Sequence, residues 1–148
     1  MDIILIAAIT IDGFISRSSD EIISWSKDLK LFKEQTMSYP VIMGSNTAKT
    51  LAVELKGREQ IVVQRNDNPK EILAELDVEK CFIIGGGRTY TKFAPFLTHL
   101  YITPHPIIFG KGIQLFPTLK KEISLKFIQK IIVAETDGVF QFQYKVIR

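Results

Sequence analysis

The sequence has few or none of several features that quickly indicate the class of a protein. It has one cysteine, Cys81, in 148 residues, so no internal disulfide can form and a reducing, cytoplasmic compartment is expected. Its longest apolar run, residues 3–9, is well short of the roughly 20 residues that a bilayer-spanning helix needs. The N-terminus has neither a basic segment nor a small-residue cleavage site, so we expect no signal peptide and no membrane partner.

The sequence also has no large excess of positive or negative charge and no cluster of metal-ligating residues. The formal net charge is +3 and the basic residues are scattered, so nucleic acid is not predicted as a partner, whereas a small anionic ligand fits. His99 and His105 have no acidic or cysteine partner at ligand spacing, which predicts no metal site. No G-x-S-x-G turn occurs, and Cys81 lacks the local signature of a nucleophile.

The composition is that of a folded protein, and its apolar pattern indicates an α/β fold. The hydrophobic fraction is 46%, which is enough apolar surface to offset chain entropy. Apolar runs predict strands at residues 3–9, 41–43, 60–63, 81–84 and 97–103. Amphipathic segments predict helices at residues 26–37 with Ser26 as cap, at 44–51, at 69–76, and from the glycines at 85–87 to about 93.

The C-terminal third has a different pattern. Residues 104–118 have no regular periodicity, and residues 125–133 and 139–146 flank Asp137-Gly138, which indicates a hairpin. In the last strand aromatic residues alternate with Gln141, Gln143 and Lys145, which predicts one buried aromatic face and one solvated face. We therefore predict one domain over residues 1–148, a three-layer α-β-α fold with a mainly parallel mixed sheet and an antiparallel C-terminal hairpin.

Two strand ends carry glycine and lead into a helix, at residues 41–47 and 82–89. Ligands of open α/β sheets bind beyond the carboxyl ends of the strands, so two helix N-termini there could hold a pyrophosphate. Ser45, Thr47, Arg88 and Thr89 would add side-chain donors. The alternative is that these glycines only make tight turns, but three in succession favour the functional interpretation. Neither G-x-G-x-x-G nor a P-loop is present.

Three further residues have a functional and a structural interpretation. Arg65 follows a predicted strand, where it could pair with a 2′-phosphate and favour NADP, or be a solvated surface residue. Asp28 lies in the first turn of a predicted helix and has apolar neighbours. It could bind the cationic or amidine-like edge of a ligand, or it could be a surface residue that only stabilises the helix through its dipole. Trp25 closes the polar loop of residues 10–24 as an anchor or a cover over a ligand.

Taken in order, these residues resemble the dihydrofolate reductase family over nearly the whole chain. The resemblance is carried by Leu5-Ile6-Ala7-Ala8, the helix at residues 28–33, residues 40–44 with Thr47, Gly57-Arg58, residues 84–88 with Tyr90, and residues 100–103. It implies NADPH-dependent reduction of 7,8-dihydrofolate to tetrahydrofolate, with hydride transfer to the pterin ring. A small-molecule heterocycle is thus the expected partner, and the chain would act in one-carbon metabolism as a monomer or homodimer.

The resemblance also implies residue roles. Asp28 would bind the edge of the pterin, supported by the Thr103 hydroxyl, with Trp25 next to the ring and a water delivering the proton. The implied substrate-binding residues are Ala7, Phe32, Leu51, Leu55 and Arg58, of which Arg58 would pair with a glutamate tail. The implied NADPH-binding residues are Ala8, Ile15, Gly44, Ser45, Asn46, Thr47, Arg65, Ile84, Gly85, Gly86, Gly87, Arg88, Thr89 and Tyr90. Residues 16–24 would be a mobile loop.

The sequence departs from the family pattern at three places. The interval from Trp25 to Asp28 is short, and Ser45 stands where many members carry a phosphate-binding arginine, for which Arg65 is a candidate substitute. The segment 106–117 looks more like the reductase domain of riboflavin biosynthesis. Two alternatives follow: a reductase of a ribosylaminopyrimidine phosphate, and a dinucleotide-binding protein without catalysis.

Overall fold

The computed structural model describes residues 1–51 and 55–148. Its strands are β1 (Asp2–Thr10), β2 (Phe14–Ser16), β3 (Val41–Gly44), β4 (Gln60–Val63), β5 (Lys80–Gly85), β6 (His99–His105), β7 (Ile113–Gln114), β8 (Ser124–Ala134) and β9 (Val139–Ile147). Its helices are α1 (Leu29–Thr36), α2 (Ser45–Thr50), α3 (Pro69–Ala74) and α4 (Gly87–Phe93), with short 3-10 turns η1 (Ala94–Phe96) and η2 (Glu135–Asp137).

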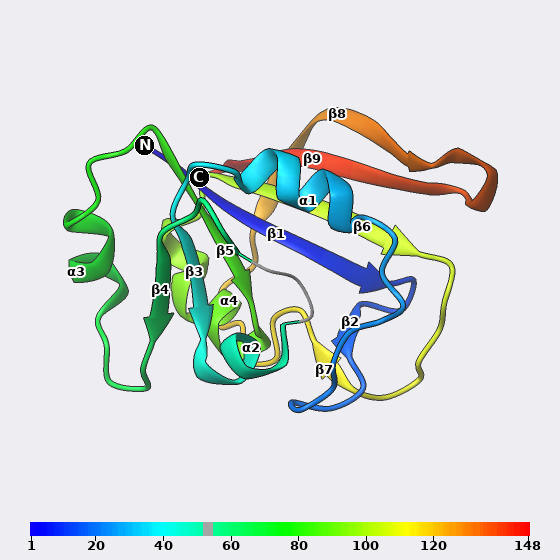
Figure 1. Cartoon of the computed structure of the whole chain (residues 1–148), viewed down its shortest axis with the longest axis horizontal. Coiled ribbons are helices and arrows are strands. Elements are labelled where there is room, and N and C mark those ends of the chain that lie inside the picture. The colour runs from blue at the N-terminus through cyan, green and yellow to red at the C-terminus, as the bar shows by residue number, and fades with distance from the viewer. Residues whose placement is uncertain (52–54) are drawn as a thin grey trace.

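The main sheet has the strand order β4-β3-β5-β1-β6-β9-β8 (Figure 1). Strands β4, β3, β5, β1 and β6 run parallel, and β9 and β8 add to them as an antiparallel hairpin. The predicted mainly parallel mixed sheet with an antiparallel C-terminal hairpin is confirmed. Because the central strands are parallel, their carboxyl ends meet at one edge of the sheet.

Helices cover both faces of this sheet. On one face Phe32 of α1 packs against the cluster that holds Ile4 and Phe82. On the other face Leu73 of α3 and Phe93 of α4 pack in the cluster that holds Leu5. The apolar run of β1 is continuous because alternate side chains enter the two clusters, which explains a strand without polar residues. The predicted three layers are present.

Helix α1 begins later than predicted. It starts at Leu29 after Asp28, and no side chain caps it, so Ser26 is not its cap. The N–H of Lys27 instead donates to Nε2 of His105 at 2.9 Å. This bond to a distant strand holds residue 27 outside the helix, and the predicted first turn of the helix is instead irregular chain with bends at Trp25 and Lys27.

The prediction for the faces of β9 was wrong. Gln141 and Gln143 are 1% and 5% exposed, whereas the aromatic side chains of this strand are half-buried. Gln35 of α1 and Gln141 exchange two hydrogen bonds of 2.7 and 2.8 Å, and Gln143 donates to Gln141 at 2.9 Å. Since α1 covers this face, the amides are buried, and pairing with one another satisfies them.

The polar segment of residues 10–24 contains a short strand that was not predicted. Strand β2 pairs antiparallel with β7, which lies in the segment predicted to be irregular. The carboxylate of Asp12 accepts hydrogen bonds from the Thr10 hydroxyl at 2.6 Å and from the Gly110 N–H at 2.8 Å. These contacts fasten the segment after β1 to the segment after β6.

Across residues 1–51 and 55–148, each helix is too short or too polar to span a bilayer.

Candidate functional site

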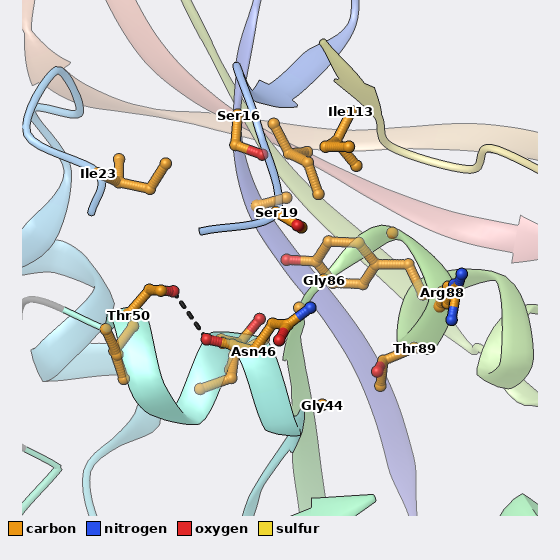
Figure 2. Close-up of a pocket in the computed structure, with 18 of the residues that line it drawn as sticks. Ser16, Ser19, Ile23, Gly44, Asn46, Thr50, Gly86, Arg88, Thr89 and Ile113 are labelled. Carbon is orange, nitrogen blue, oxygen red and sulfur yellow. Dashed lines mark hydrogen bonds between the residues drawn. The ribbon is translucent and has the colours of Figure 1, made fainter. Parts of the chain in front are cut away.

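A cavity of about 940 Å³ opens at the carboxyl ends of β1, β3 and β5. Figure 2 shows Asn46 and Thr50 of α2 and Arg88 and Thr89 of α4 around it. Ser16, Ser19 and Ile113 border it from the segments around β2 and β7. The β2 and β7 segments therefore form a wall of the same cavity that the strand-to-helix turns border.

Most of the predicted site residues line this cavity. The predicted cofactor-binding residues that line it are Ala8, Ile15, Gly44, Ser45, Asn46, Thr47, Arg65, Ile84, Gly85, Gly86, Gly87, Arg88, Thr89 and Tyr90. The other predicted site residues that line it are Asp28, Ala7, Phe32 and Leu51. We call the turns at residues 44–47 and 85–89 the glycine side of the cavity, and residues 26–32 the Asp28 side.

The two turns of the glycine side pack tightly against each other. Gly85 has φ +135°, and a Cβ there would lie 3.3 Å from the Thr47 hydroxyl. A Cβ on Gly44 would lie 2.8 Å from the Thr89 hydroxyl. Helices α2 and α4 start at these turns and neither has a side-chain cap. The glycines therefore permit the close approach of two uncapped helix starts.

Basic side chains border the glycine side. Arg65 follows β4, and Arg88 and Lys92 lie four residues apart on α4. The Lys92 ammonium donates to the carbonyls of Gln64 and Arg65, each at 3.0 Å, and so holds the turn after β4. Lys92 and Gln64 were not predicted as site residues. The i, i+4 spacing from Arg88 is the sequence signal that places Lys92 on the same helix face.

Asp28 is a buried acid, only 6% exposed. Burial raises the pKa of its carboxyl and outweighs its own backbone N–H and the Thr103 hydroxyl, which lower this pKa in part. Its neighbours along α1, Leu29 and Phe32, also line the cavity. A carboxyl held in such apolar surroundings can hold a proton more readily than an exposed one, and it can bind a flat polar ligand edge.

Thr103 lies beside Asp28, Trp25 packs against His105, and neither residue lines the cavity. Trp25 Nε1 is buried without a hydrogen-bond partner among the described residues. The buried Thr103 Oγ1 makes no contact of normal hydrogen-bond geometry there, although it lies close enough to lower the pKa of Asp28. The Trp25 ring packs edge-on against His105 and Phe109, at centroid distances of 5.3 and 5.4 Å. Buried polar atoms are generally paired in proteins, so these two atoms mark positions that a ligand or a water can complete.

Arg58 and Leu55, both predicted to bind substrate, are not among the lining residues. Arg58 is 7% exposed, and its guanidinium donates to the Thr36 hydroxyl at 3.0 Å and to the Lys56 carbonyl at 3.3 Å. Burial lowers the pKa of this guanidinium. Leu55 packs in the apolar cluster beneath α1. Both residues follow the segment 52–54, which lies outside the described residues.

The family model described as "Dihydrofolate reductase" matches residues 2–144. The chain belongs to the dihydrofolate reductase family. A type 3 dihydrofolate reductase of Salmonella typhimurium is 35% identical over 117 residues, which cover 70% of this chain and 71% of that protein. The dihydrofolate reductase of Buchnera aphidicola subsp. Baizongia pistaciae is 29% identical and aligns over 100% of this chain and 98% of its own. As a family member, the chain is an oxidoreductase.

Solved structures show the same fold. The dihydrofolate reductase of Enterococcus faecalis, solved with NADP(H) and RAB-propyl, has a TM-score of 0.76 at 21% identity and covers 99% of this chain and 97% of its own. A structure from Shewanella sp. PV-4 described as a riboflavin biosynthesis protein has a TM-score of 0.69 at 20% identity, with 100% of both chains covered. The predicted family, fold class and enzyme class are confirmed, and a dihydrofolate reductase-type oxidoreductase has a nicotinamide cofactor and a small-molecule substrate.

Proposed function

We propose that this chain, as one reductase domain, catalyses the NADPH-dependent reduction of 7,8-dihydrofolate to tetrahydrofolate, a step of one-carbon metabolism. The observation that carries this proposal is a single cavity lined both by a buried carboxyl, Asp28, and by a glycine-rich wall bordered by basic side chains. In a member of the dihydrofolate reductase family, that pairing supports a heterocycle on the Asp28 side and a dinucleotide on the glycine side.

The glycine side fits a phosphorylated dinucleotide. Residues 45–47 and 86–89 would hold the pyrophosphate with uncapped N–H groups and with the hydroxyls of Thr47 and Thr89. Arg65 would pair with the 2′-phosphate, aided by Arg88 and Lys92 at the same wall. When bound, NADPH supplies the hydride, and the chain supplies position and electrostatic environment.

The Asp28 side fits a flat, polar heterocycle. Asp28 would bind the amino and ring N–H edge, and the buried Thr103 hydroxyl beside it would support that contact. Phe32 would pack on the ring from α1. Arg58, whose orientation the Thr36 hydroxyl fixes, is our candidate for the carboxylate of a glutamate tail. A water would deliver the proton to the ring nitrogen, as the family resemblance implies.

A second substrate has one observation in its favour. The riboflavin biosynthesis structure aligns with the whole chain, and Gly112, Gln114 and Pro117 of the segment that looks like that family line the cavity. The substrate of that alternative carries a phosphate, which requires a cation beside Asp28. Among the described lining residues the cations are Arg65, Arg88 and Lys92, all from β4 and α4 segments. These three cations are assigned to the dinucleotide for either substrate, and the family match is what favours dihydrofolate.

A turnover assay tests the proposal. The purified chain is mixed with NADPH and dihydrofolate, and the loss of nicotinamide absorbance is followed. Parallel reactions contain NADH, or the ribosylaminopyrimidine phosphate in place of dihydrofolate. We expect turnover with dihydrofolate and a preference for NADPH. Turnover with the pyrimidine phosphate alone contradicts the substrate, and tight NADPH binding without turnover on either heterocycle contradicts catalysis.

A further inference from the structure

His105 is a buried histidine at the carboxyl end of β6 with a hydrogen bond on each ring nitrogen. Its exposed fraction is 0%, and it lies outside the residues that line the cavity. The Lys27 N–H approaches Nε2 at 2.9 Å, and Nδ1 lies 2.8 Å from the Thr103 carbonyl oxygen. A backbone N–H can only donate and a carbonyl can only accept, so Nε2 carries the lone pair and Nδ1 the proton.

The two hydrogen-bond partners of this imidazole lie next to two proposed site residues. Lys27 directly precedes Asp28, and Thr103 is itself the residue whose buried hydroxyl lies beside that carboxyl. Helix α1 starts immediately afterwards with no side-chain cap, so the chain entering it depends on tertiary contacts. One ring therefore connects the backbone next to Asp28 with the backbone of Thr103.

The other contact of Lys27 is weaker. Its ammonium pairs with Asp137 of η2 at 2.6 Å, but the two side chains are 49% and 47% exposed, and exposed pairs contribute little. The Trp25 ring packs against the imidazole in a T-shaped arrangement, with the two ring centroids 5.3 Å apart. The partly buried hydrogen bond to Nε2 is thus the more effective of the two described contacts that hold residue 27.

We propose that His105 is a positioning residue, which sets the separation of Asp28 and Thr103 by holding their backbones through its neutral imidazole. The proposal rests on the proposed function, in which these two side chains contact the heterocycle. Misplacement of a contacting group by about 1 Å can reduce turnover up to about 100-fold. Because His105 touches neither the glycine side nor its cations, it is expected to act on the heterocycle and not on the dinucleotide.

Substitutions that keep or remove the Nε2 acceptor test this role. The amide oxygen of His105→Gln can reach the position of Nε2, whereas His105→Phe keeps a ring and has no acceptor. We expect His105→Phe to lose about 10- to 100-fold in kcat/KM for dihydrofolate with an unchanged Kd for NADPH. We expect His105→Gln to recover most of that loss. His99→Phe, at the start of the same strand, is the matched control.

The outcomes separate positioning from mere stability. Unchanged kcat/KM in a folded His105→Phe, or a His105→Gln as poor as His105→Phe, overturns the proposal. A loss of NADPH affinity equal to the loss in kcat/KM also overturns it, because a general loss of folding would produce that. Where His105→Phe does not fold, His105→Gln and the unmodified chain remain available.

The ring nitrogens of the unmodified chain give a test without turnover. In a ¹⁵N spectrum at neutral pH we expect a proton on Nδ1 of His105 and none on Nε2. A protonated Nε2 overturns the proposal, because the Lys27 N–H would then have no acceptor. Absence of dihydrofolate turnover by the unmodified chain contradicts the proposed function instead, and leaves this spectrum to decide whether His105 holds residue 27.

Discussion

On the glycine side of the cavity each residue follows its own strand directly, whereas on the Asp28 side the residues come from distant parts of the chain. Gly44-Ser45 continues β3 and Gly85-Gly86-Gly87 continues β5. Asp28, by contrast, lies beside Thr103 and His105, about half the chain away in sequence. The comparison teaches that the geometry of a strand-to-helix turn can be local, while the environment of a buried acid depends on long-range packing.

Substitution of the buried acid should have the largest effect. Asp28→Asn keeps the shape but removes the charge and the exchangeable proton, and we expect kcat/KM for dihydrofolate to fall by about 10²- to 10⁴-fold. Initial rates over neutral pH measure this. Asp67→Asn, at the turn before α3, is the control. Rates equal to those of the unmodified chain would remove Asp28 from the reaction.

A charge on the glycine side should have a smaller and more selective effect. Loss of a charge-assisted contact is worth about 1.5–3 kcal/mol, so we expect Arg65→Gln to weaken NADPH binding about 10- to 100-fold. NADH lacks the 2′-phosphate, so its Kd should not change. Titration of both cofactors by fluorescence compares them, with Lys70→Gln on α3 as the control for net charge. Equal weakening of both cofactors would show that Arg65 does not distinguish them.

The close packing of the glycine side can be tested with a methyl group. Gly85→Ala places a Cβ 3.3 Å from the Thr47 hydroxyl and 3.5 Å from the Tyr90 hydroxyl, at φ +135°. Strain at such a φ is worth about 1–3 kcal/mol, so we expect a lower free energy of unfolding and weaker NADPH binding.

The control for Gly85→Ala is Gly138→Ala. Gly138 has φ +70° with no atom within 4 Å of an added Cβ, so that variant should lose stability alone. Denaturant unfolding and cofactor titration of both variants provide the comparison. NADPH affinity that is unchanged in Gly85→Ala would show that the two turns tolerate separation.

The smallest effect concerns the pH dependence of stability. Burial raises the pKa of Asp28 above its ordinary value of 3.8, so the folded state binds this proton more tightly than the unfolded state. The resulting stability is present below the unfolded pKa and is lost as pH rises through the folded pKa. At neutral pH, Asp28→Asn should therefore unfold at a higher urea concentration than the unmodified chain, and the difference should shrink toward pH 3. A more stable unmodified chain at neutral pH would contradict this sign.

Local patterns predicted some elements well and others poorly. The strand at residues 60–63 was predicted with the bounds that the structure has, since an apolar run between a glycine turn and an Asn-Pro turn is a local signal. The cap of helix α1 was predicted two residues too early, because the Lys27 N–H donates to the distant His105 and the helix begins only at Leu29. Strand β2 was missed because its partner β7 lies about 100 residues away.

Alternation in β9 predicted two different faces but assigned the solvent to the wrong one. Periodicity separates Gln141 and Gln143 from the aromatic residues, yet it does not tell which face another element will cover. Helix α1 brings Gln35 onto the glutamine face, where amides pair and are buried. The half-buried aromatic side chains, such as Phe142, lie on the face opposite to Gln35.

The family, the layered α/β fold and the glycine-rich turns could all be predicted from the sequence alone. Each depends on short runs of residues whose geometry is local. The partners of Asp28, the burial of Arg58 and the tautomer of His105 emerge only in the folded molecule. Burial and hydrogen-bond partners depend on which distant segments pack together, and in this protein they govern the chemistry of the buried acid Asp28.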